Sequence, residues 1–87
     1  MIEGKTKSGF EYQIPEENIN NYELLEALGE AEANPLYFPK TINLLLGKEQ
    51  AEKLKNHLRT ENGIVPIDKL KDDIMEIFES QKEAKNS

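Results

Sequence analysis

Residues 34–79 contain helix-stop signals at short intervals, and this spacing limits the chain to short helices. The stops are the Asn34-Pro35 step, Gly47 with the Lys-Glu pair after it, and the run of residues 62–66, Asn-Gly-Ile-Val-Pro. Proline lacks a backbone N–H, and glycine tolerates the left-handed conformation in which helices commonly end. Between the stops, apolar side chains recur at three- and four-residue spacing, the period of an amphipathic helix. The pattern predicts three short helices over this stretch.

A different period precedes this region. A turn signal at residues 7–9, Lys-Ser-Gly, separates two short segments, and after it Phe10, Tyr12 and Ile14 alternate with polar residues. Alternation with a period of two is typical of a β-strand, so residues 2–14 predict a hairpin whose aromatic face packs on helices. The following segment predicts one further helix from a stripe of apolar residues, which are Tyr22, Leu24, Leu25, Leu28 and Ala31.

We therefore expect a mainly α protein of the α+β type, in which a short N-terminal β-hairpin is followed by about four short helices in a small bundle. A chain of 87 residues is long enough for one domain. We assign residues 1–79 to a single small globular domain, with the hairpin over 2–14 and the helices over 18–79. Residues 80–87 have no large apolar side chain to bury and are expected to form a disordered polar tail.

Acidic residues outnumber basic ones by 17 to 11, and the formal net charge is −6. A nucleic-acid partner needs a basic patch that displaces counterions, so we expect none. The longest apolar run is Leu44-Leu45-Leu46, and the N-terminus lacks the apolar core of a signal peptide. We therefore expect neither a membrane partner nor secretion. The chain has no cysteine, which agrees with a reducing compartment such as the cytoplasm.

Residues that could carry chemistry are few and isolated. His57 is the only histidine, and the sequence around it offers no orienting partner and no cysteine nucleophile. The turn at Gly63 resembles a calcium-binding loop, but Leu58 and Lys69 stand where that loop needs Asp and Glu ligands. Four carboxylates of the last helix are expected on its solvated face; they are Asp72, Asp73, Glu76 and Glu79. We therefore expect no enzyme, no bound metal and no cofactor.

Short motifs along most of the chain carry a resemblance to a known family. They are Ser8-Gly9-Phe10, Asn34-Pro35-Leu36, Pro39-Lys40, residues 44–50, Leu54, His57-Leu58-Arg59, residues 62–66 and residues 74–78. With these motifs the chain resembles the small tail assembly chaperones of long-tailed phages and prophages of Gram-positive bacteria. The resemblance implies a protein that binds the tape measure protein and keeps it soluble while tail tube subunits polymerise around it.

The same resemblance implies further partners and a second form of the chain. The tape measure protein is the expected partner, with the tail tube protein and a second copy of the chain as further candidates. A longer form would arise by ribosomal frameshifting near the end of the reading frame. The residues Ala84-Lys85-Asn86 are compatible with the slippery run A-AAA-AAC.

Tyr37, Leu44 and Met75 fall beside the predicted core stripes, and with Leu45 and Phe78 of the stripes they are candidate partner contacts. Such residues either widen the core or form a surface patch for a partner, and both interpretations stay open here. A second hypothesis is a small acidic regulator or inhibitor that docks on a basic host protein through the acidic last helix. Binding of that kind would depend strongly on salt.

Overall fold

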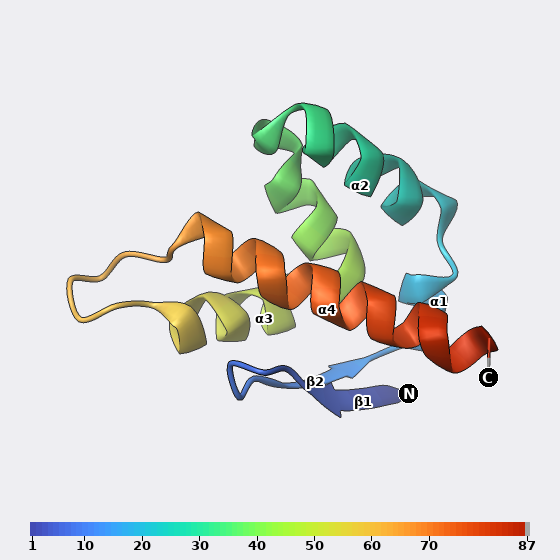
Figure 1. Ribbon diagram of the computed structural model, residues 1–87, viewed down its shortest axis with the longest axis horizontal. Coiled ribbons are helices and arrows are strands. Elements are labelled where there is room, and N and C mark those ends of the chain that lie inside the picture. The colour runs from blue at the N-terminus through green and yellow to red at the C-terminus, as the bar shows by residue number, and fades with distance from the viewer. Residues whose placement is uncertain (87) are drawn as a thin grey trace.

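The computed structural model describes the backbone of residues 1–86 and the side chains of residues 1–81. A hairpin at the N-terminus is followed by helices that make up most of the chain (Figure 1). In chain order the elements are β1 (Ile2–Lys5), β2 (Glu11–Ile14), α1 (Glu16–Ile19), α2 (Tyr22–Ala33), the 3₁₀ turn η1 (Pro35–Tyr37), α3 (Phe38–Leu58) and α4 (Ile67–Asn86). Within the described residues the fold is mainly α, with a short hairpin and four α-helices, which confirms the expected class.

The hairpin strands pair in an antiparallel register that places Gly4 opposite Tyr12. On β2, Tyr12 and Ile14 are buried while Glu11 and Gln13 are exposed, as the period of two predicted. The buried face packs on α3, which gives the hairpin the support that an isolated pair of strands needs. In Figure 1 the hairpin lies along the lower edge of the molecule, next to the second half of α3.

Asparagine side chains begin two of the helical elements. The Asn21 Oδ1 atom accepts a hydrogen bond from the Glu23 N–H at 3.0 Å, at the start of α2. The Asn34 Oδ1 atom accepts one from the Leu36 N–H at 3.1 Å, at the start of η1. Each bond satisfies one of the backbone donors that the first turn of a helix leaves free. The single turn α1, which precedes α2, was not predicted from the sequence.

The helix α3 contains a break where the sequence predicted the end of one helix and the start of the next. Gly47 has φ 82° and ψ 161°, a combination that only glycine adopts readily. Just before the break, the Leu45 carbonyl accepts a hydrogen bond from the Asn18 side chain at 3.0 Å. Figure 1 shows the first half of α3 descending from the end of α2 and the second half turning away toward the hairpin.

The central element of the fold is α3, because α1, α2, α4 and β2 all pack against it. The largest fully buried side chains come from β2, α2, α3 and α4. They are Ile14, Leu24, Thr41, Leu45, Leu54, Ile74 and Ile77. The helix α2 packs chiefly on α3 and η1 rather than on α4. The flanks of α2 and α4 that face each other are therefore only partly covered.

The C-terminal segment differs from the disordered tail expected over residues 80–87. The helix α4 continues to Asn86. The physical reason is that residues 80–86 contain neither proline nor glycine and consist mostly of residues with favourable helix propensity. Ser87 lies outside the described residues.

Candidate functional site

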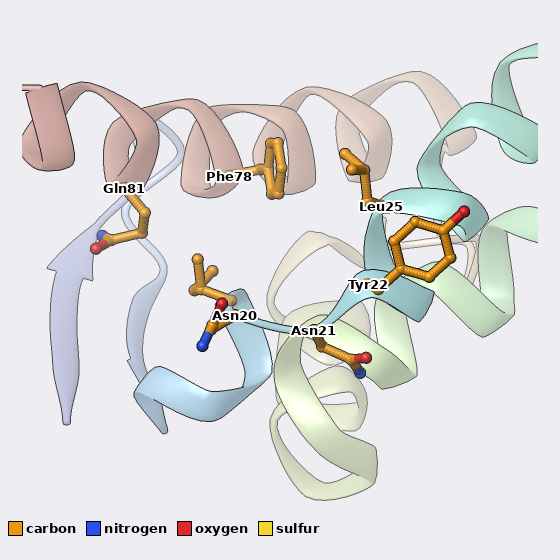
Figure 2. A pocket seen from close by; sticks show the side chains of 7 residues that line it. Asn20, Asn21, Tyr22, Leu25, Phe78 and Gln81 are labelled. Atoms are coloured by element: carbon orange, nitrogen blue, oxygen red, sulfur yellow. The ribbon is translucent and has the colours of Figure 1, made fainter.

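Two hollows lie between α2 and α4. The larger one, at the N-terminal end of α2, has a volume of about 410 Å³ and is lined by Ile19, Asn20, Asn21, Tyr22, Leu25, Phe78 and Gln81 (Figure 2). The smaller one, at the other end of α2, has a volume of about 150 Å³ and is lined by Leu28, Ala31, Glu32, Pro35, Phe38, Ile67, Lys71 and Met75. We call the surface formed by these two sets of residues the α2–α4 seam.

Helical geometry explains why α2 keeps an apolar flank for the seam. Successive residues turn by about 100° around a helix axis, so Leu24 and its neighbour Leu25 cannot face the same core. Leu24 is fully buried, whereas Leu25 is 58% exposed and Tyr22 is 71% exposed. The helix α2 therefore carries two apolar stripes, of which α3 covers one and the seam displays the other.

The apolar side chains of α4 are likewise divided between the core and the seam. Ile74 and Ile77 are fully buried, while Met75 and Phe78 are half-buried and Ile67 is 71% exposed. Figure 2 shows Phe78 of α4 and Leu25 of α2 pointing into the space between the two helices. The seam is consequently lined by apolar side chains from both helices.

The chemistry of the seam is that of a binding surface. Most of its lining is apolar, and polar groups gather at its two ends, with Asn20, Asn21 and Gln81 at one end and Glu32 and Lys71 at the other. Grooves of this kind bind the apolar face of a helix, and polar residues at the rim fix its orientation. Apolar surface of this type on a small domain marks a candidate interaction site.

The five predicted contact residues fall in different places. Met75 and Phe78 line the smaller and the larger hollow, respectively. Tyr37 is 41% exposed on η1, outside both linings. Leu44 is half-buried against the core, and Leu45 is fully buried in it. Leu45 therefore has no surface to offer a partner, because it lies on the face of α3 that the other elements cover.

Three large apolar residues of the seam are exposed and were not among the predicted contacts, namely Tyr22, Leu25 and Ile67. In the sequence, Tyr22 and Leu25 fall in one apolar stripe, which was interpreted as a single core face. The adjacent pair Leu24-Leu25 was a usable signal, because two neighbours on a helix point about 100° apart. For Ile67 the sequence offers no comparable signal, since it follows Pro66 at the start of an apolar stripe.

All four carboxylates of α4 were expected on a solvated face, and for two of them this expectation is wrong. Asp73 and Glu76 accept hydrogen bonds from the hairpin turn. Asp73 is only 4% exposed, and its Oδ2 atom accepts hydrogen bonds from Thr6 Oγ1 at 3.0 Å and Ser8 Oγ at 2.6 Å. The Glu76 carboxylate accepts from the Lys7 N–H, at 3.1 Å for the shorter of two contacts. These bonds attach the hairpin turn to α4. Asp72 and Glu79 remain exposed.

His57 supports the same turn from α3. Its Nε2–H donates to the Ser8 carbonyl oxygen at 2.9 Å. Its ring also lies against Phe10, with the two ring centroids 5.8 Å apart. The visible contacts of His57 are therefore those of a side chain that positions a backbone turn.

One carboxyl group elsewhere has a perturbed pKa. On the exposed face of α3, the hydrogen bond from Lys55 Nζ at 2.8 Å and the positive charge of Lys55 lower the pKa of Glu52 below its usual value. This is an ion pair three residues apart on a helix surface. Across the described residues, no three His, Cys, Asp or Glu side chains are grouped so that they could hold a metal ion.

Comparisons with protein-family models, with curated proteins and with solved structures found no match. Among the described residues, no helix combines the length and the apolar character needed to cross a bilayer.

Proposed function

We propose that this chain is a non-enzymatic tail assembly chaperone of a long-tailed phage, which binds the tape measure protein in the host cytoplasm and assists tail tube assembly. The observation that carries the proposal is the α2–α4 seam, an apolar surface that includes Met75 and Phe78, two of the contacts predicted from the apolar pattern of the sequence. A tape measure protein is long, helical and apolar, so it needs its helix faces covered until the tube forms. A helix-binding seam suits that task.

The net charge supports the same role. At −6, the chain repels other copies of itself, and a complex coated with it stays dispersed. A chaperone of this kind acts by covering apolar surface and keeping the complex soluble.

The alternative of a small acidic regulator loses part of its basis. That hypothesis needs the carboxylates of α4 to face a basic partner, but Asp73 and Glu76 accept hydrogen bonds from the hairpin turn. Only Asp72 and Glu79 of the four keep exposed positions. We therefore place the functional surface in the seam.

The proposal is tested by expressing the chain together with the tape measure protein of the same phage gene cluster. We expect the chain to raise the soluble fraction of the tape measure protein several-fold and to copurify with it. Leu25→Asp should abolish both effects, because it places a charge in the larger hollow, where burial of an unpaired charge is costly.

Ile64→Asp is the matched control. Ile64 is 61% exposed, close to the 58% of Leu25, but it does not line the seam. It should keep full chaperone activity, and both variants should retain the helical circular dichroism spectrum. A tape measure protein that stays insoluble beside the unmodified chain, or equal loss of activity in both variants, would rule out the proposed function.

A further inference from the structure

The seam has the length of a short helix. From Tyr22 to Glu32, residues of α2 line the two hollows in turn. At 1.5 Å of rise per residue this stretch spans about 15 Å, or about three helical turns. A partner helix of that length can place one anchor side chain in each hollow, with the bulkier anchor in the larger one.

Exposed carboxylates flank the seam on both helices. Residues four or three apart are neighbours on a helix surface, so Glu26 lies beside Tyr22 on α2 and Asp72 lies beside Met75 on α4. Glu32 lines the smaller hollow itself. None of these three carboxylates forms an ion pair in the part of the chain that the structure describes. Lys71 is the one basic residue among the described residues that line the hollows.

These charges disfavour a second copy of the chain as the occupant at neutral pH. In a two-fold symmetric dimer the same patch meets itself. The acidic rim of one copy, formed by Glu26, Glu32 and Asp72, would then face the acidic rim of the other, and opposed like charges weaken an interface. The apolar lining and the acidic rim are instead complementary to a helix with an apolar face and basic flanks.

We infer that the seam binds a basic amphipathic helix of about three turns, with its apolar face against Leu25, Met75 and Phe78 and its Lys or Arg residues against Glu26, Glu32 and Asp72. The inference specifies which segments of a tape measure protein the chain selects, and to that extent it rests on the proposed function. The apolar contacts supply most of the affinity, and the rim charges select the partner and its orientation.

The test uses two synthetic amphipathic peptides of about 14 residues, almost four helical turns, so that three turns remain helical when the ends fray. They share one leucine face and differ only in carrying Lys or Glu on its flanks. Binding of each labelled peptide to the full chain is followed by fluorescence anisotropy. We expect the Lys peptide to bind at least about tenfold more tightly than the Glu peptide, with a difference that narrows at high salt.

A charge-reversal variant and a matched control locate the effect. Glu26→Lys with Asp72→Lys should remove or invert the preference for the Lys peptide. Glu49→Lys with Glu61→Lys makes the same change in net charge at exposed positions outside the seam, and it should keep the preference. Equal affinity of the unmodified chain for both peptides, or the same loss of preference in both variants, overturns the inference.

Two further outcomes separate the inference from the proposed function. If the Lys peptide binds in the seam but the tape measure protein does not, the proposed function fails and the surface assignment stands. If the tape measure protein binds through Leu25 but the peptides show no charge preference, the inference fails and the function stands. A dimer of the unmodified chain at neutral pH that Leu25→Asp dissociates would make a second copy the occupant and would also overturn the inference.

Discussion

Asp73 and Glu76 hold the hairpin turn on α4 through hydrogen bonds, in addition to the apolar contacts that the hairpin makes with α3. Asp73 is the more deeply placed of the two, and it accepts from both Thr6 and Ser8. The Thr6 hydroxyl oxygen in turn accepts from the Phe10 N–H at 3.2 Å. One carboxylate therefore organises the turn and joins the first residues of the chain to its last helix.

We expect Asp73→Ala to lower the free energy of unfolding by about 1–3 kcal/mol, because it leaves the hydroxyls of Thr6 and Ser8 without their acceptor. Asp72→Ala removes a neighbouring exposed carboxylate and should change stability by no more than about 0.5 kcal/mol. Urea unfolding monitored by circular dichroism measures both. Equal effects of the two substitutions would show that the bonds to the hairpin turn contribute nothing to stability.

The sequence could predict the turn and the helix at this contact but not the contact itself. Residues 7–9 read as a turn, and Asp73 reads as one of several acidic residues on an amphipathic helix. Asp73 falls three residues after Leu70 and four before Ile77, both buried, so its spacing already placed it at the edge of the core face. That two hydroxyls face it depends on where the hairpin docks, which no local pattern specifies.

At the scale of the elements, two glycines in helical segments have opposite roles. Gly47 creates the break in α3 with a positive φ, so its flexibility is needed. Gly29 lies inside α2, and a Cβ built there would meet no atom within 4 Å. It therefore weakens α2 without a visible packing reason.

We expect Gly47→Ala to destabilise the protein by about 1–3 kcal/mol, since alanine does not readily adopt this backbone conformation. Gly29→Ala should stabilise it by about 0.5–1 kcal/mol, because alanine loses less conformational entropy in a helix. Thermal unfolding of the two variants and of the unmodified chain shows directly whether each substitution raises or lowers stability. Stabilisation by Gly47→Ala would mean that α3 is continuous in solution.

Element boundaries were predictable where a residue type forces them. Gly47 and Pro66 mark a helix break and a helix start in the structure as they do in the sequence. The one-turn helix α1 had no such signal, because four residues are too few to show a helical period. The adjacent leucines Leu24 and Leu25 indicated that the apolar surface of α2 is wide. The sequence did not indicate which part of that surface is buried in the core and which part belongs to the seam.

At the scale of the whole molecule, the seam exists because α2 packs on α3 rather than on α4. The break at Gly47 accompanies this arrangement, because it turns the second half of α3 away from α2 and toward the hairpin (Figure 1). Hydrophobic periodicity predicts that α2 and α4 each have an apolar face. Which part of each face is covered depends on this three-dimensional arrangement, which periodicity does not specify. Met75 and Phe78 could therefore be named as apolar candidates, but the exposure of Tyr22, Leu25 and Ile67 could not be predicted.

The seam and the net charge together predict that self-association depends on pH. At neutral pH the charge of −6 keeps exposed apolar surfaces apart. Near the isoelectric point of about 4.8 the net charge of the chain falls to zero, and this repulsion between copies disappears. We therefore expect a monomer at pH 7 and reversible association near pH 4.8, measured by sedimentation velocity.

If the seam drives this association, removing its most exposed apolar side chains should prevent it. Leu25→Gln with Ile67→Gln changes two exposed seam residues and should leave the chain monomeric at both pH values. Ile64→Gln changes an equally exposed residue of the loop and should associate at pH 4.8 as the unmodified chain does. Association at pH 7 would show that the net charge does not prevent self-contact. Equal association of both variants at pH 4.8 would show that the seam does not drive it. Monomeric behaviour at neutral pH together with seam-dependent association near pH 4.8 would mean that negative charge keeps the seam of one copy from binding another copy. The seam then stays accessible at neutral pH to a basic partner, which this charge attracts.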